Sequence, residues 1–139
     1  MAKPLKTIRF TIRGFRWTAQ IFTPEDYLEI EKQHETEESD AMTLRDKQLL
    51  LFKSTAIDRV TVRHEMVHAF ICTLHLSSVD LDGEQMEEIF AEFISTSIEE
   101  YIRVSDSLFK RIKSFSEKLN VRKTKKTQAV AGTSGASTV

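Results

Sequence analysis

Two histidines four residues apart, with a glutamate directly after the first, stand at His64, Glu65 and His68. On a helix, residues at this spacing face the same way with Cβ atoms roughly 5–6 Å apart, so both imidazoles can reach one ion at about 2.0–2.1 Å. Glu65 is rotated by about 100° from His64 and can reach a water on that ion without binding the ion itself. Zinc lowers the pKa of such a water towards about 7, and a carboxylate can then accept its proton. The pattern predicts Zn2+ held by His64 and His68, with Glu65 as general base.

The residues around this motif favour a helix with one apolar side. No proline interrupts the segment, and apolar residues recur at helical spacing at Val60, Val67, Ile71 and Leu74. The alternative is that His64 and His68 border this stripe and bond to carbonyl groups of the core. The metal hypothesis is preferred because two histidines and a glutamate occur together in the spacing that the chemistry needs.

A catalytic zinc site needs a third protein ligand, and the next predicted helix can supply an acid. Glu88 and Glu92 are four residues apart and flank Phe90, where an unpaired carboxylate would be costly. Glu88 is the predicted ligand, and Glu92 would hydrogen-bond a ligand histidine and fix its tautomer. Glu87 is a rival for the ligand position, and Glu92 could itself be the ligand. Both named acids could instead be surface charges of the helix.

The remaining histidines are not predicted to bind the metal. His75 would lie about 10 Å along the helix axis from His68, too far to share an ion. His34 lies in an acidic stretch and is predicted to be on the surface. The longer metzincin motif, H-E-x-x-H-x-x-G-x-x-H, is not completed, since Ile71 and Leu74 stand where its glycine and last histidine would be.

The elements before the motif read as two strands or one bent strand, followed by a helix. Apolar residues recur mostly at every second position over residues 7–22, with a break at Gly14, which predicts one bent strand or a tight hairpin. Thr23 and Pro24 mark a helix start, because threonine can cap and proline suits the first helical position. This helix is expected to fray into the acidic residues 29–40.

The element order predicts an α+β fold, with a small sheet packed on helices. Residues 41–44 and 48–52 are predicted to form a hairpin whose second, almost wholly apolar strand lies inside the sheet. Helical periodicity is then predicted over residues 54–75, 84–102 and 108–119. The motif helix is therefore followed directly by the helix that carries the candidate acids.

The end of the chain differs in composition from the rest. Residues 1–119 are predicted to form a single domain, and residues 120–139, rich in Gly, Ser, Thr and Ala, a flexible tail. The tail begins with a basic run, Arg122, Lys123, Lys125 and Lys126. Such a run could contact phosphates weakly and with strong salt dependence. No aromatic residue is interleaved, so base stacking is not expected.

The length, composition and net charge of the chain limit the classes of function that it can have. The chain has 139 residues, 40% hydrophobic and 29% charged, with a net charge of -1, which suits one domain with a substantial core. Near-zero net charge predicts no general attraction to nucleic acid or to an acidic membrane. The single cysteine, Cys72, excludes an internal disulfide. No signal peptide or membrane span is recognisable, so a cytoplasmic location is expected.

The motif and the helix after it resemble the gluzincins, zinc peptidases in which an H-E-x-x-H helix is followed by a helix carrying a ligand glutamate. The matching residues are His64, Glu65, His68, Glu88 and Glu92. The short spacing is similar to that of the minimal ImmA/IrrE-like and phage-encoded metallopeptidases. The resemblance covers roughly residues 7–103 and implies a minimal zincin-like domain over residues 1–119.

One departure limits what this resemblance implies. The ImmA/IrrE-like group usually has an Asn or Asp near the ligand glutamate and a longer C-terminal region, and neither is clear in this sequence. Its substrate class, protein repressors cleaved at one site, is therefore not carried over.

Two functions follow from these residues. The first is a zinc-dependent metallopeptidase that hydrolyses a peptide bond in a protein partner, with Glu65 as general base. The alternative is a catalytically inactive zincin-like module that acts through protein–protein contacts, encoded by a phage or mobile element and working in the host cytoplasm. A structural zinc site is usually closed by four protein ligands, so three candidate ligands favour catalysis.

Overall fold

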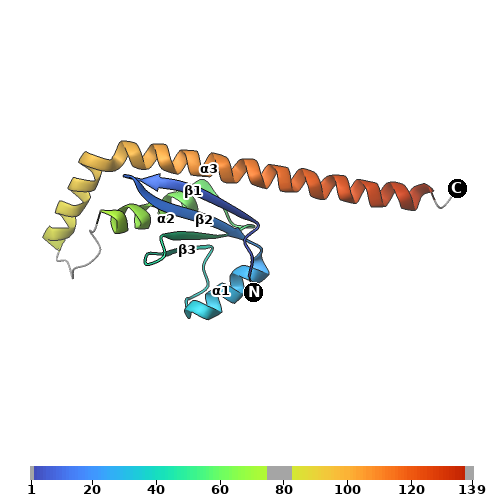
Figure 1. The fold of residues 1–139 in the computed structure, drawn as a ribbon, viewed down its shortest axis with the longest axis horizontal. Coiled ribbons are helices and arrows are strands. Elements are labelled where there is room, and N and C mark those ends of the chain that lie inside the picture. Colours follow the sequence, from blue (N-terminus) through green and yellow to red (C-terminus); the bar gives the residue numbers. More distant parts are fainter. Residues whose placement is uncertain (1, 75–82, 137–139) are drawn as a thin grey trace. The chain divides into compact units, whose positions relative to one another are not determined.

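The computed structural model describes residues 2–74 and 83–136, with the backbone alone at residues 83 and 127–136. The chain divides into two compact units, Met1–Phe109 and Lys110–Val139. In chain order the elements are β1 (Lys6–Ile12), β2 (Phe15–Phe22), α1 (Pro24–His34), β3 (Ala41–Leu44), β4 (Leu49–Lys53), α2 (Arg59–Thr73) and α3 (Gly83–Ala136), as Figure 1 shows. The predicted α+β fold, a small sheet with helices, is confirmed.

The first two strands form an antiparallel hairpin, which is one of the two arrangements that the sequence predicted. Its turn consists of Arg13 and Gly14, with φ angles of 48° and 81°. Two positive φ angles match the twist of a two-residue hairpin loop, and glycine adopts them without steric cost. Arg13 is held in place by α3, since its backbone N–H donates to Glu100 Oε1 at 3.0 Å and its Nη2 donates to Ser97 Oγ at 2.8 Å.

The sheet has the strand order β1-β2-β4-β3. Strand β4 pairs in parallel with β2 and antiparallel with β3, so it is a central strand, as predicted. Its residues Leu50, Leu51 and Phe52 are at most 3% exposed, because both sides of the sheet are covered here. Strand β3 lies at one edge of the sheet.

The strand register decides which side chains face which helix. Ala19 pairs with Leu50, and Leu50 pairs with Thr43, so the three side chains project from the same side of the sheet. Trp17 is on this side too, and its Nε1 donates to Thr73 Oγ1 of α2 at 2.9 Å. The other side packs against α1, in the cluster Phe22, Tyr27, Ile30, Met42 and Leu51. Thr43 therefore faces α2.

Helix α1 begins as predicted but continues further than expected. Thr23 Oγ1 accepts a hydrogen bond from the Asp26 N–H at 3.2 Å, and Pro24 is the first helical residue. The helix leaves the acidic stretch 29–40 later than expected, since it ends at His34 and residues 35–40 are not helical. Its last turns are held because Glu31 is buried and its Oε1 accepts from the Ser39 N–H at 3.2 Å.

Helix α2 begins at Arg59, later than the predicted residue 54. The Ser54 N–H donates to the carbonyl of Phe22 at 2.8 Å, which keeps the chain in a turn after β4. Asp58 then caps the helix, and its carboxylate accepts from the Thr61 N–H at 2.7 Å. These hydrogen bonds hold the pKa of Asp58 below its ordinary value. The helix ends at Thr73, and His75 lies outside the described residues.

Helix α3 is a single helix where the sequence predicted two. The polar segment 103–107 contains no glycine or proline, and Val104 and Ser105 are buried within it, so packing continues the helix through the expected break. Residues 120–136, predicted to be a flexible tail, are also helical. The predicted domain boundary near residue 120 stays a prediction, while the first compact unit ends at Phe109. Within the described chain, no helix has the length and apolar character needed to span a membrane.

Candidate metal centre

Helix α2 is fixed against the sheet by a buried stripe that leaves the motif on its flank. Val62, Met66, Ala69 and Phe70 are at most 1% exposed. At about 100° per residue, Glu65 lies beside this stripe, and the two histidines lie further round the helix. Accordingly Glu65 is buried, His68 is half-buried and His64 is exposed. The helix thus presents its histidines at the surface and its glutamate towards the sheet.

The two imidazoles point to a common position. His64 Nε2 and His68 Nε2 are 3.3 Å apart, with ring centroids 5.0 Å apart and planes at 76°. Two nitrogens that each lie 2.0–2.1 Å from one tetrahedral ion are about 3.3–3.4 Å apart. A hydrogen bond between two neutral rings fits the same distance, with one Nε2 protonated. For both Nε2 atoms to bind one ion, each neutral ring carries its hydrogen on Nδ1 instead. The pair therefore fits two adjacent positions of a zinc coordination sphere.

The environment of His68 favours the form that binds metal. Burial lowers the pKa of His68, and the neighbouring His64 and Arg45 lower it further, while Glu65 opposes them. A lowered pKa leaves the imidazole neutral over a wider pH range. Neutral imidazole is the form that ligates metal ions, so less proton release accompanies binding at His68.

Glu65 is held by the edge strand of the sheet. The hydroxyl of Thr43, on β3, donates a hydrogen bond to Glu65 Oε2. Glu65 is only 6% exposed, and a carboxylate at such a position needs a partner. Sequence reasoning missed Thr43 because period-two patterning places it on a strand but does not give the register that turns it towards α2.

The predicted third ligand does not meet the histidines in this structure. Glu88 and Glu92 are both exposed on α3. Across residues 2–74 and 83–136, no group of three His, Cys, Asp or Glu side chains is close enough to share an ion. The ligand role of Glu88 and the supporting role of Glu92 stay predictions, as does the rival Glu87.

Aromatic packing explains the orientation of these acids. Phe93 is 8% exposed and stacks edge-to-face on Phe70 of α2, with ring centroids 6.0 Å apart. At about 100° per residue, Glu92 and Glu88 are rotated by about 100° and 140° from Phe93. The sequence predicted that the acids flank a buried Phe90, but Phe90 is in fact 52% exposed. The packed side of α3 is therefore not the side that was expected.

Tyr101 joins α3 to the motif helix. Its hydroxyl donates to the Arg63 carbonyl at 2.9 Å, and its ring lies 5.7 Å from that of Phe70. Burial is the main cause that raises the pKa of Tyr101. Its hydroxyl hydrogen is thus used in holding α3 on α2, immediately before His64 in the chain.

Comparisons of this chain with models of known protein families, with curated proteins and with solved structures find no match. The resemblance to gluzincins stays an expectation carried by the motif residues. The geometry around His64, Glu65 and His68 is therefore the basis for a proposed function.

Proposed function

We propose that the protein is a zinc-dependent metallopeptidase that hydrolyses a peptide bond in a protein or peptide partner. The observation that carries this proposal is the 3.3 Å separation of His64 Nε2 and His68 Nε2, which fits two ligands of one tetrahedral zinc ion. Glu65, between them in sequence and buried beside them, supplies the third functional group. The proposed location is the cytoplasm, that of the host if the protein is encoded by a phage.

His64 and His68 would hold the zinc ion, with Glu88 proposed as third ligand. Zinc in such a site supplies Lewis acidity and lowers the pKa of water towards about 7. Glu65 then accepts the proton of the attacking water and can pass it to the leaving amine. Thr43 has a positioning role, because its hydroxyl fixes one oxygen of the Glu65 carboxylate. Proton transfer is assigned to the other carboxylate oxygen, which Thr43 does not contact.

The edge strand supports a peptide substrate. Strand β3 ends the sheet order, so one of its sides has no strand partner within the described chain. An extended peptide can pair with such an edge through backbone hydrogen bonds. Thr43 lies on this strand and contacts Glu65, so a peptide aligned on β3 would pass close to the general base.

The first test is the zinc content of protein purified without chelators, measured by elemental analysis. The expected result is about one zinc per chain, because the two histidines define one ion. The variant His64→Ala should lose this zinc, whereas His34→Ala, which changes an exposed histidine in α1, should retain it. Folded protein that takes up no added zinc would refute the metal site.

The second test separates catalysis from metal binding. Zinc-loaded protein is incubated with a peptide library, and new chain ends are identified by mass spectrometry, with Glu65→Gln as control. Removal of a general base is expected to slow hydrolysis by about 10²–10⁴-fold while zinc stays bound. Equal cleavage by both proteins would exclude Glu65 as the base.

A second candidate function, an inactive zincin-like module that binds another protein, is favoured by one surface. Four large apolar side chains of α3, 47–56% exposed, recur at intervals of four or eight residues: Met86, Phe90, Ile94 and Ile102. Such a stripe is typical of a helix that packs against a partner. A chain that binds zinc and cleaves nothing in the library would support this function over peptidase activity.

A further inference from the structure

The second unit of the chain carries a charge opposite to that of the first. Lys110–Val139 contains eight Lys or Arg residues and one acid, Glu117, for a net charge of +7. Met1–Phe109 contains twelve Lys or Arg and twenty Asp or Glu residues, for a net charge of -8. The total of -1 hides this asymmetry. A strongly basic segment attached to an acidic domain indicates a separate, anionic partner.

The helical conformation gathers these charges on one side. At about 100° per residue, Arg111, Lys118, Arg122 and Lys125 fall within an arc of about 60° around α3. All four side chains are exposed. Glu117 lies outside this arc, so its negative charge is not among the four cations. Because residues 120–139 were predicted to be a flexible tail, the sequence did not place Arg122 and Lys125 on one face with Arg111 and Lys118.

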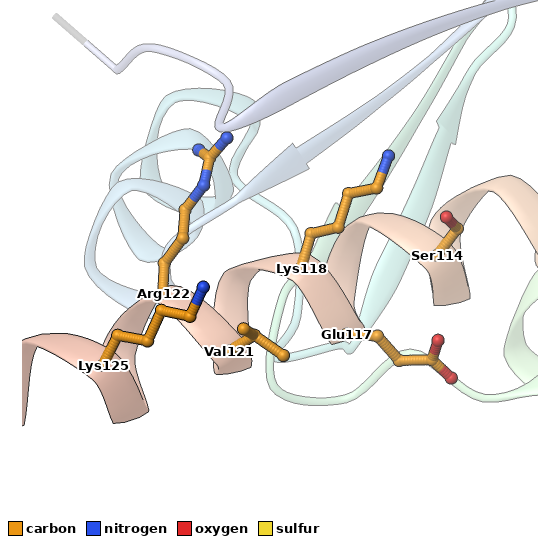
Figure 2. Close-up of a pocket in the computed structure, with 6 residues that line it drawn as sticks. All are labelled: Ser114, Glu117, Lys118, Val121, Arg122 and Lys125. Atoms are coloured by element: carbon orange, nitrogen blue, oxygen red, sulfur yellow. The ribbon is translucent and has the colours of Figure 1, made fainter. Parts of the chain in front are cut away.

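Three of these cations border one recess on the helix surface. The recess has a volume of about 370 Å³ and is lined by Ser114, Glu117, Lys118, Val121, Arg122 and Lys125. Figure 2 shows Lys118 and Arg122 extending from the same side of α3, with Glu117 directed away from them. Ser114 adds a hydroxyl donor beside the cations. This combination suits phosphate oxygens, which accept hydrogen bonds from guanidinium, ammonium and hydroxyl groups.

We propose that this face of α3, defined by Arg111, Lys118, Arg122 and Lys125, binds the phosphate backbone of double-stranded nucleic acid. From Arg111 to Lys125 the helix rises about 21 Å at about 1.5 Å per residue. One strand of a duplex presents a phosphate about every 3.4 Å of axis, so several phosphates lie within reach of the face. The binding is independent of base sequence, because phosphate contacts carry no direct sequence information. This function does not depend on the zinc site.

An anionic membrane fits this face less well than a duplex does. Helices that lie in a membrane surface combine basic residues with exposed apolar side chains that enter the lipid. Over residues 110–126, Val121 is the only large apolar side chain that is exposed, and its exposed fraction is 53%. A duplex needs only the cations, and its major groove or backbone can accommodate a helix.

The test uses the full chain and a labelled DNA duplex of random sequence. Binding is measured by fluorescence anisotropy at a series of salt concentrations, for the wild type and for the triple variant Lys118→Gln, Arg122→Gln, Lys125→Gln. Glutamine is close to lysine and arginine in helix propensity, so the helix should persist, which circular dichroism checks. Three lost phosphate contacts should reduce the salt slope by about 2.7, so that between about 50 and 200 mM salt the affinity of the variant falls about 40-fold less than that of the wild type.

The matched control removes three exposed cations of the first unit, Lys3→Gln, Lys6→Gln and Arg16→Gln, for the same change in net charge. The expected result is a salt slope close to that of the wild type. No binding by the wild type at low salt, or equal weakening by both triple variants, would overturn the proposal. So would binding to vesicles of phosphatidylserine and phosphatidylcholine in the absence of binding to the duplex.

Discussion

The two helices that carry the predicted zinc ligands differ in how the core holds them. In α2, buried side chains stand next to the motif residues. Val62 lies two positions before His64, and Met66 lies two positions before His68. Over residues 84–92 of α3, by contrast, every side chain is exposed except Ile89, which is half-buried. The first buried side chain described on α3 is Phe93. The pair of histidines is thus positioned by packing, and the candidate acids are not.

This difference indicates how the site would be completed. A site is precise where its residues stand on packed elements, as His64, Glu65 and His68 do. The turns of α3 that carry Glu88 and Glu92 have no such constraint, so packing does not choose between these two acids. Coordination itself would then select the third ligand, and part of the binding free energy of zinc would be used to order it.

Zinc affinity gives the largest expected effects. His64→Ala should weaken zinc binding by more than about 100-fold, because even the loss of a residue that only orients a ligand costs about 10–100-fold. If Glu88 is the third ligand, Glu88→Gln should fall in the same range, and Glu92→Gln should cost about 10–100-fold. Competition with a chromogenic chelator measures all three. An unchanged affinity for Glu88→Gln with a large loss for Glu92→Gln would exchange the two roles.

Stability provides the next comparison, between two phenylalanines three residues apart on α3. Phe93 is 8% exposed and Phe90 is 52% exposed. Phe93→Ala should lower the free energy of unfolding by about 3–5 kcal/mol, since a buried aromatic ring leaves a cavity. Phe90→Ala should change it by no more than about 0.5 kcal/mol, as exposed substitutions do. Urea denaturation of both variants decides whether the core contact of α3 begins at Phe93. Similar losses of stability would show that Phe90 is packed as well as Phe93 is.

Much of the fold could be predicted from local patterns. Period-two apolar spacing with a break at Gly14 predicted either a hairpin or one bent strand, and the structure has the hairpin. The apolar run at Leu50 predicted a central strand, which is confirmed. The start of α2 could not be predicted, because Ser54, Thr55 and Asp58 are all suitable caps. The choice depends on a hydrogen bond from Ser54 to the end of β2, a contact between residues distant in the sequence.

In the candidate site too, local geometry could be predicted from the sequence and tertiary contacts could not. The spacing of His64 and His68 fixes their relation because one helix carries both, and helix geometry is local. Thr43 and the orientation of Glu88 depend instead on strand register and on which face of α3 packs. Both are tertiary properties, decided by pairing of Thr43 with Leu50 and by burial of Phe93. Sequence patterns therefore predict sites within one element better than sites between elements.

Loss of the hydrogen bond between Thr43 and Glu65 should destabilise the protein less than loss of the Phe93 ring. Thr43→Val keeps the side-chain shape but removes the hydroxyl that donates to the buried carboxylate. Leaving that group without its partner should cost about 1–3 kcal/mol of stability and should also slow hydrolysis. Thr7→Val, at an exposed position on the opposite edge strand β1, is the matched control and should be nearly neutral. Equal unfolding midpoints for the two variants would show that Thr43 does not hold Glu65.

The smallest expected effect concerns Tyr101, through which α3 contacts α2. Burial raises the pKa of Tyr101 above its ordinary value of about 10, so the folded state favours the protonated phenol. The stability gained is fully present below about pH 10 and is lost as the pH rises through the folded-state pKa. Tyr27, whose pKa is raised to about 12, loses its own contribution between about pH 10 and pH 12, but it does so equally in the wild type and in a Tyr101 variant.

Urea midpoints measured from about pH 8 to pH 11 should therefore fall more steeply for the wild type than for Tyr101→Phe, which cannot titrate at this position. The variant also loses the hydrogen bond to the Arg63 carbonyl, so it should start from a lower midpoint at neutral pH. A difference between the two proteins that does not change with pH would mean that the phenol is equally accessible in both states. The attachment of α3 to α2 would then rest on the packing of the Phe93 and Tyr101 rings on Phe70, without a contribution from burial of the phenol hydroxyl.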